Sequence, residues 1–288
     1  DGLTWSEPRF ISGNKIAGDT HNNALWAPTL GKYVGFTRTW GKTDRRLVGP
    51  ETKTNHAWGR QVARIESADF CHWSKSEVVI DCKKWEHQPY AMPVFFHANT
   101  YIGLLAIHDQ ISDRVWTELA WSPDTKNWHR INEGLPLIDS CPNPLGYDFG
   151  CIYACASPIF LEDEIRVYYG GSDWLHTGWR NGCLALATLR PDGFAGYEQI
   201  NANELGRIRT NALDYKGQAV KVSADVSKNG WIKASLIDNA HSVISSVQIS
   251  KTSTDTNLFD RQVIDEDTVR IEFEFNAAKL YSFAFSSE

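Results

Sequence analysis

Ser67-Ala68-Asp69-Phe70-Cys71-His72-Trp73 and Ser122-Pro123-Asp124-Thr125-Lys126-Asn127-Trp128 are two copies of one turn motif, and this motif decides the fold. In each copy, Ser stands two residues before Asp and Trp stands four residues after it. The Asp carboxylate can accept hydrogen bonds from the turn backbone, and the Trp ring can fill the space between neighbouring sheets. A partial copy is Asp1-Gly2-Leu3-Thr4-Trp5, and a degenerate copy is Arg190-Pro191-Asp192-Gly193-Phe194.

The spacing of the motifs predicts the repeating unit. Their Asp residues are separated by 68, 55 and 68 positions. That length is too long for a helical solenoid repeat and suits a four-stranded sheet. Short aromatic and β-branched runs with turn residues between them lie between the motifs, for example Tyr33-Val34-Gly35-Phe36 and Ile165-Arg166-Val167-Tyr168-Tyr169. We therefore predict an all-β fold in which residues 1–197 form about three blades of a β-propeller, with the motif between the third and fourth strands of a blade.

Three blades are too few to close a ring, since propellers typically have about 4–8 blades. The chain also begins inside a motif, at Asp1. We therefore expect N-terminal blades of a longer protein to be absent from this sequence. A mature end produced by processing is the alternative, and the sequence leaves both open.

The pattern changes at about residue 198, where the motifs stop. Longer alternating runs follow at residues 219–224, 231–237, 243–249, 269–275 and 280–285. Alternation of this kind indicates strands with one buried and one solvated face. Residues 198–288 are therefore predicted to form a β-sandwich.

Composition limits the partners. The formal net charge of −6 argues against a nucleic-acid surface, and no apolar stretch is long enough to predict a membrane partner. The six cysteines are neither a disulfide scaffold nor a metal cluster, and CxxC and HExxH do not occur. The sequence therefore predicts no cofactor and no metal site.

Candidate catalytic residues come from the loops that lead into the innermost strand of each predicted blade. These loops carry Asp19, Glu86 and Asp148 among aromatic, His and amide residues. Carboxyls that converge on one pocket acquire different pKa values, and glycosidases need two of them on either side of the bond that is cleaved. Asp19 is alternatively a turn cap, and Glu86 is alternatively a solvated surface charge.

The ends of the second strands of the predicted blades are expected to lie at the same mouth of the propeller channel. A long polar loop that begins at Gly170 is expected there too. Loops of that length usually serve a site or are disordered. We predict His176 as a catalytic residue beside Asp19 and Asp148, either as a proton donor or as a group that hydrogen-bonds the substrate, and a surface histidine is the alternative. Flat aromatic rings beside polar groups suit the faces and hydroxyls of a sugar. The predicted carbohydrate-binding residues are Arg38, Glu86, Tyr90, His108, Asp173, Trp174 and Arg180.

Two stretches carry a family resemblance. Arg64-Ile65-Glu66-Ser67-Ala68-Asp69-Phe70-Cys71-His72-Trp73-Ser74 resembles a blade signature of glycosidase propellers, and Ile165-Arg166-Val167-Tyr168-Tyr169-Gly170-Gly171 with His176 resembles their last blade. The whole chain resembles the C-terminal two-thirds of proteins similar to glycoside hydrolase family 32, which have a five-bladed propeller followed by a β-sandwich.

The resemblance implies a glycoside hydrolase whose acids project from the innermost strands, which supports Asp19 and Asp148. It also implies a secreted or periplasmic location. The Asn-Asp-Pro, Arg-Asp-Pro and Glu-Cys motifs of fructan-cleaving enzymes are missing, as is an assignable arginine triad of the sialidase kind. Fructan and sialic-acid specificity are therefore not predicted.

Three functions remain open from the sequence. In a hydrolase, the Asp19 and Asp148 carboxyls would lie roughly 5–10 Å apart. A carbohydrate-binding propeller without catalysis would use the same aromatic residues and need no paired acids. A polysaccharide lyase would use His176, Tyr90 and Arg180 to abstract a proton beside a uronic acid, so a mouth dominated by Arg, His and Tyr would favour it.

Overall fold

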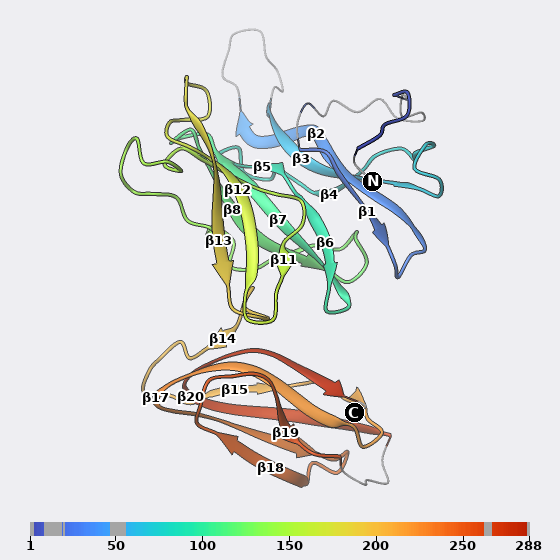
Figure 1. The fold of residues 1–288 in the computed structure, drawn as a ribbon, viewed down its shortest axis with the longest axis vertical. Coiled ribbons are helices and arrows are strands. Elements are labelled where there is room, and N and C mark those ends of the chain that lie inside the picture. The colour runs from blue at the N-terminus through green and yellow to red at the C-terminus, as the bar shows by residue number, and fades with distance from the viewer. Residues whose placement is uncertain (1–2, 9–18, 20, 47–55, 262–266, 287–288) are drawn as a thin grey trace. The chain divides into compact units, whose positions relative to one another are not determined.

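The structure is a computed structural model that describes residues 3–8, 19, 21–46, 56–261 and 267–286 (Figure 1). These residues form strands, turns and bends, with no helix among them, so the all-β prediction is confirmed. The chain divides into two compact units. One comprises residues 1–159 and 166–188, and the other comprises residues 160–165 and 189–288.

The first sheet is a four-stranded antiparallel meander in the order β1-β2-β3-β4. Its strands are β1 (Asn23–Ala27), β2 (Lys32–Arg46), β3 (His56–Ser67) and β4 (Glu77–Ile80). Strand β2 pairs with β3 from Tyr33↔Ser67 to Arg46↔His56. Alternation along these strands buries Val34, Phe36 and Val62 in a shared apolar core, which fixes the register because a one-residue slip would expose them.

The second meander has the same strand order. Strands β5 (His87–Ala91) and β6 (Val94–His97) both pair with β7 (Thr100–Asp109), which pairs with β8 (Arg114–Ser122) and then β9 (His129–Arg130). Pro93 interrupts the first strand because it lacks the N–H that a ladder needs.

A third set of strands joins the second in one nine-stranded sheet. It contains β10 (Cys151–Ala154), β11 (Ile159–Phe160), β12 (Ile165–Ser172) and β13 (Gly182–Leu189). A parallel bridge from Cys151 to Val115 joins β10 to β8. The first strands of the second and third sets, β5 and β10, carry Tyr90 and Tyr153, whose ring centroids lie 5.4 Å apart.

The two turn motifs make matching hydrogen bonds. Asp69 Oδ1 accepts from the backbone N–H groups of Cys71 and His72, at 2.8 Å each. Asp124 Oδ1 accepts from Lys126 and Asn127 at 2.9 and 2.8 Å. In both motifs the Trp Nε1 donates at 3.0 Å to the carbonyl three residues earlier. One motif follows β3 and the other follows β8.

The other two copies differ. Asp1 lies outside the described residues, and Trp5 is 87% exposed. Asp192 Oδ2 accepts from the hydroxyls of Ser223 and Ser282, at 2.8 Å each. Asp192 therefore binds distant serines of the second compact unit.

The second compact unit is built on two long strands, β17 (Ala219–Ile237) and β20 (Thr268–Ser286), which pair antiparallel. The strands β14 (Tyr197–Glu198), β15 (Gly206–Arg209) and β16 (Leu213–Asp214) pair with β20, while β18 (Val243–Ile249) and β19 (Ser253–Phe259) pair with β17. The β-sandwich and the boundary after residue 197 stay predictions.

Four of the strands expected in this part merge into two. The expected runs 219–224 and 231–237 are one strand, and the runs 269–275 and 280–285 are another. The pairing register shifts between Val226 and Trp231, and Asn229 and Ala277 there have φ of 66° and 45°. The irregularity bends the ladder without ending it, which is how a β-bulge acts.

Candidate functional site

Tyr90, on β5, is the centre of a group of polar and aromatic side chains that we call the Tyr90 cluster. Members come from β2, β3, β7, β10, the loop after β12 and the segment before β1. All have a ring or guanidinium group within 6.3 Å of the Tyr90 ring centroid: His21, Arg38, Arg60, His108, Tyr153 and His176.

Arg38 joins Asp19 to this cluster. Its guanidinium lies 4.3 Å from the Tyr90 ring centroid, and its Nε donates to the Tyr90 carbonyl at 3.3 Å. Arg38 Nη1 also forms an ion pair of 2.5 Å with Asp19 Oδ1. The Arg38 side chain is 3% exposed and the Asp19 side chain is 67% exposed. A buried arginine thus holds a carboxylate that faces solvent.

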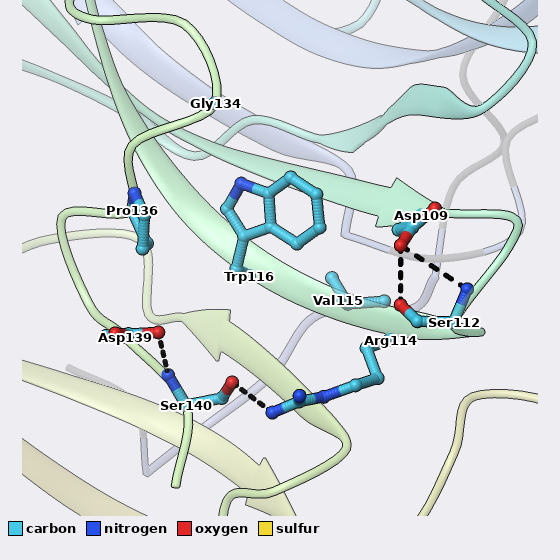
Figure 2. Close-up of a pocket in the computed structure, with 9 residues that line it drawn as sticks. All are labelled: Asp109, Ser112, Arg114, Val115, Trp116, Gly134, Pro136, Asp139 and Ser140. Carbon is cyan, nitrogen blue, oxygen red and sulfur yellow. Dashed lines mark hydrogen bonds between the residues drawn. The ribbon is translucent and has the colours of Figure 1, made fainter. Parts of the chain in front are cut away.

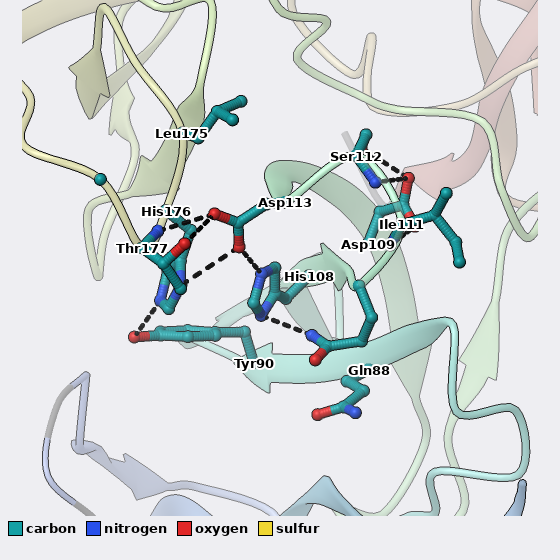
Figure 3. A network of polar contacts seen from close by, with 12 residues as sticks. Gln88, Tyr90, His108, Asp109, Ile111, Ser112, Asp113, Leu175, His176 and Thr177 are labelled. Carbon is teal, nitrogen blue, oxygen red and sulfur yellow. Dashed lines mark hydrogen bonds and ion pairs between the residues drawn. The ribbon is translucent and has the colours of Figure 1, made fainter.

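Asp113 lies between two imidazoles (Figure 3). Its Oδ1 is 2.9 Å from His108 Nε2 and 3.8 Å from His176 Nδ1. Its Oδ2 accepts from the Thr177 backbone N–H at 2.8 Å and from the Thr177 hydroxyl. The other nitrogen of His176, Nε2, lies 3.2 Å from the Tyr90 hydroxyl. The turn between β7 and β8 places Asp113 here with a φ of 55°, a conformation that Asp tolerates better than most residues.

Burial favours the uncharged form of the histidines. It lowers the pKa of His176 to about 4, and His108 and Arg60 add to this effect. Burial also lowers the pKa of His108 and of His21, and the charge of Arg38 adds to the effect on His21. Burial alone would raise the pKa of Asp113, but hydrogen bonds from Thr177 and His108 outweigh it and lower that pKa.

Three buried side-chain atoms of the described residues have no hydrogen-bond partner, and all three belong to the Tyr90 cluster. They are Arg60 Nε, the Tyr153 hydroxyl and His176 Nδ1. Buried polar groups are normally paired, and an unpaired one costs about 1–3 kcal/mol. Three such atoms around one ring indicate a place where a polar ligand binds.

The positive charge of Arg60 is not neutralised by an ion pair among the described residues. Within the part of the chain that the structure describes, it forms no ion pair with a carboxylate. Its Nη1 instead donates to Gln88 Oε1 at 2.9 Å and lies 3.3 Å from His108 Nδ1. Burial lowers the pKa of Arg60, and Arg38 adds to this effect. The half-buried positive charge of Arg60 favours an anionic group in the site.

Six of the ten predicted site residues are linked at this place. Arg38, Tyr90, His108 and His176 belong to the cluster, Asp19 pairs with Arg38, and Arg180 donates to the His176 carbonyl. They come from segments far apart in the sequence, and strand pairing brings them together. Their individual roles stay predictions.

The other four predicted residues have different surroundings. Asp148 is 3% exposed, and its carboxylate accepts from the Tyr169 hydroxyl at 2.8 Å and from the Cys141 N–H at 3.2 Å. Asp173 accepts from Asn181 and closes the loop after β12. Trp174 is 39% exposed and lies 6.1 Å from the Phe149 ring. Glu86 is exposed at the start of β5.

The loop that carries His176 is fixed at several points. The His176 backbone N–H donates to the Asp113 carbonyl at 2.8 Å, and Arg180 binds the His176 carbonyl. Gly150 lies directly against this loop, since a Cβ at Gly150 would be 1.6 Å from the Trp174 carbonyl oxygen. The loop is thereby held against β7, β8 and β10.

Sequence reasoning missed four residues of the site. Arg60 lies inside β3, and Asp113 lies in a turn, so neither follows a turn motif or precedes an innermost strand. Tyr153 and His21 stand in or next to the loops that lead into the predicted innermost strands. That position was the one feature of the sequence that could have identified them as site residues.

Two cavities among the described residues are lined by residues outside this cluster. Figure 2 shows a cavity of about 300 Å³ beside the turn that carries Asp113, lined by residues that include Asp109, Arg114 and Trp116. A second, of about 630 Å³, is lined by residues that include Lys84, His87 and Arg130. None of the unpaired atoms lines either cavity. The Tyr90 cluster is therefore the stronger candidate, because it combines unpaired polar atoms with the predicted residues.

No protein-family model and no curated protein sequence matches the chain. Solved structures do. It is similar to an N-acetylgalactosamine deacetylase from F. plautii in complex with blood group B trisaccharide, with 12% identity and a TM-score of 0.41 over 66% of this chain and 53% of that one. It is also similar to a family 43 arabinoxylan arabinofuranohydrolase from Bacillus subtilis, with 10% identity and a TM-score of 0.36 over 92% of this chain and 66% of that one.

A fructofuranosidase from Schwanniomyces occidentalis is a third similar structure, with 10% identity and a TM-score of 0.27 over 96% of each chain. Glycoside hydrolases of families 43 and 32 are thus among the similar structures. The chain spans between 44% and 66% of the length of three of the matched structures. With TM-scores below 0.5, these likenesses assign neither activity nor substrate to this chain. No helix long and apolar enough to cross a membrane occurs among the described residues.

Proposed function

We propose that this chain is a carbohydrate-active enzyme of the glycoside hydrolase type, with the Tyr90 cluster as its sugar-binding site. The observation that carries the proposal is the set of three buried, unpaired polar atoms around Tyr90. Sugar hydroxyls can both donate and accept, so one saccharide ring can satisfy several such atoms at once. Trp40, 39% exposed and with Arg60 5.1 Å above its ring, offers an apolar face beside them.

Asp19 is the carboxylate that we assign to hydrolysis. It is exposed to the solvent from which a substrate comes, and Arg38 fixes one of its oxygens. A carboxylate held in one orientation is suited to act as a base or nucleophile, and Asp148 is the predicted second carboxyl. Because Asp148 is buried and accepts hydrogen bonds, its share in the reaction needs a direct test.

A lyase is the second candidate, and Arg60 is the observation that favours it. A guanidinium without a carboxylate partner can bind the carboxylate of a uronic acid, which makes the neighbouring C–H more acidic. The Tyr90 hydroxyl is then the group placed to accept that proton while it passes its own proton to Nε2 of uncharged His176. The leaving oxygen departs as the double bond forms.

The test is a panel of neutral and uronate-containing oligosaccharides, assayed with two readouts on the same samples. New reducing ends without ultraviolet absorbance indicate hydrolysis, whereas new absorbance from an unsaturated sugar indicates elimination. Saccharide binding without either product would assign a binding function. Absence of binding to every member of the panel would overturn the carbohydrate proposal.

Variants then separate the two reactions. If the chain is a hydrolase, Asp19→Asn lowers kcat by about 10²–10⁴-fold, as expected for loss of one acid–base group. If it is a lyase, Tyr90→Phe does so and Asp19→Asn does not. Asp163→Asn, in an exposed turn, is the matched control.

For Asp148→Asn, lost turnover with an unchanged Tm supports the predicted catalytic role, while a lower Tm with unchanged turnover assigns a structural one.

A further inference from the structure

We propose that His108, Asp113 and His176 form a binding site for one divalent transition-metal ion of the Zn²⁺ or Co²⁺ class. It makes His176 Nδ1, one of the three unpaired atoms of the proposed sugar site, a metal ligand, and it departs from the sequence, which predicts no metal site. The ligand atoms are His108 Nε2, an Asp113 carboxylate oxygen and His176 Nδ1, all within 4.8 Å of one another. No linear spacing signals the set, since two of the residues lie on β7 and its following turn and the third lies on a loop more than 60 positions later.

The distances suit a small ion. Zn–N and Zn–O bonds of about 2.0–2.2 Å put neighbouring ligands of a tetrahedral site roughly 3–3.5 Å apart. Asp113 Oδ1 lies 2.9 Å from one imidazole nitrogen and 3.8 Å from the other, and all three ligand atoms lie within 4.8 Å of one another. Small rotations of the three side chains are enough to surround an ion.

The unpaired nitrogen of His176 is the second observation. Nδ1 is buried, makes no hydrogen bond and faces Asp113 Oδ1. In the tautomer with the proton on Nε2, Nε2 donates to the Tyr90 hydroxyl and Nδ1 presents a lone pair to a carboxylate oxygen. Two electron-rich atoms in that arrangement repel each other unless a cation lies between them.

The supporting contacts are those that a metal site needs. Metal-bound imidazoles and carboxylates are normally held at their second polar atom. Here Tyr90 holds His176 Nε2, Gln110 lies 2.7 Å from His108 Nδ1, and Thr177 holds Asp113 Oδ2 (Figure 3). For metal binding, His108 takes the Nδ1–H tautomer and the Gln110 amide turns its oxygen toward that proton.

The donor set indicates the class of metal. Two imidazole nitrogens and one carboxylate oxygen suit first-row transition metals, whereas Ca²⁺ and Mg²⁺ prefer oxygen ligands alone. Three protein ligands leave at least one position for water or a substrate oxygen. Arg60 lies on the Nδ1 side of His108, away from the proposed ion at Nε2.

The experiment is titration of the chelator-treated chain with ZnCl₂ and CoCl₂, followed by calorimetry and by Co²⁺ absorption. We expect one ion per chain, a visible Co²⁺ spectrum without a sulfur charge-transfer band, and a Tm raised by Zn²⁺. The absence of that band would show that the Co²⁺ ion is not bound by the thiols of the free cysteines. CaCl₂ and MgCl₂ are expected to bind at least 100-fold more weakly than ZnCl₂.

Two variants test the residues. His176→Gln and Asp113→Asn are each expected to weaken Zn²⁺ binding at least 100-fold, while His129→Gln, which changes an exposed histidine outside the cluster, leaves it unchanged. Far-UV circular dichroism shows whether each variant is folded, and if one fails to fold, the other decides. Absence of binding to the unmodified chain, or equal binding by a folded variant, overturns the proposal.

Discussion

His176 Nε2 lies 3.2 Å from the hydroxyl of Tyr90, and this hydrogen bond joins the loop after β12 to strand β5 across 86 positions of sequence. It matters because His176 Nδ1 is already unpaired and buried. Among the described residues, the His176 imidazole therefore makes a hydrogen bond only to Tyr90. The orientation of His176 toward Asp113 depends on this bond.

Tyr90→Phe should reduce the free energy of unfolding by about 1–3 kcal/mol, because it leaves both nitrogens of His176 without a hydrogen-bond partner. Chemical denaturation measures the change. Tyr197→Phe is the control, since Tyr197 is 69% exposed and its change should stay within about 0.5 kcal/mol. Equal stability of Tyr90→Phe and the unmodified chain would show that the bond contributes nothing.

Gly150→Ala should destabilise the loop that carries His176. The new Cβ would meet the Trp174 carbonyl at 1.6 Å, and that atom belongs to backbone that cannot turn away. Overpacking of this kind costs about 1–3 kcal/mol or more. At Gly170 the nearest atom to a Cβ is 4.0 Å away, so Gly170→Ala is a fair control. Thermal unfolding and proteolysis of the loop should separate the two, and similar Tm values would contradict the close approach.

The contribution of Asp124 to stability should depend on pH. Burial alone would raise the pKa of Asp124, but the N–H groups of Asn127 and Lys126 outweigh it and lower the pKa to about 2 from an ordinary value of 3.8. The stabilisation is therefore complete above the ordinary value and disappears as pH falls through the folded value.

Asp124→Asn checks this relation. The stability difference between the unmodified chain and the variant should be largest near neutral pH and shrink between about pH 4 and pH 2. Urea unfolding across that range is the measurement. A difference that stays constant over the whole range would rule out the titration of Asp124 as its cause.

Thr125→Val should remove a bond between the first two sheets. Arg64 Nε, on β3, donates to Thr125 Oγ1 at 2.8 Å, and the Arg64 side chain is 3% exposed. Loss of the acceptor leaves a buried donor unpaired, at a cost of about 1–3 kcal/mol. Thr125→Ser keeps the hydroxyl and should recover most of that stability. If Ser and Val variants unfold alike, the contact with Arg64 is not what Thr125 supplies.

The sequence by itself determined the features that depend on near neighbours. The Asp69 and Asp124 turns are made by residues within four positions of the Asp, so their spacing can be recognised in the chain. Alternating apolar residues likewise determined most strands. The alternation of apolar residues is interrupted near Asn229 and Ala277. In the sequence this interruption looks like a turn between two strands, but in the structure it is a register shift inside one continuous pair of strands.

Only the tertiary structure decided which polar residues share a site. Arg38, Tyr90, His108 and His176 were predictable because they stand at strand ends or in a long polar loop. Arg60 and Asp113 were not, because their place depends on how β3 and β7 align with β5. Burial decided the rest: removal of water leaves His176 Nδ1, Arg60 Nε and the Tyr153 hydroxyl unpaired, and a linear sequence does not encode which polar atoms lose water.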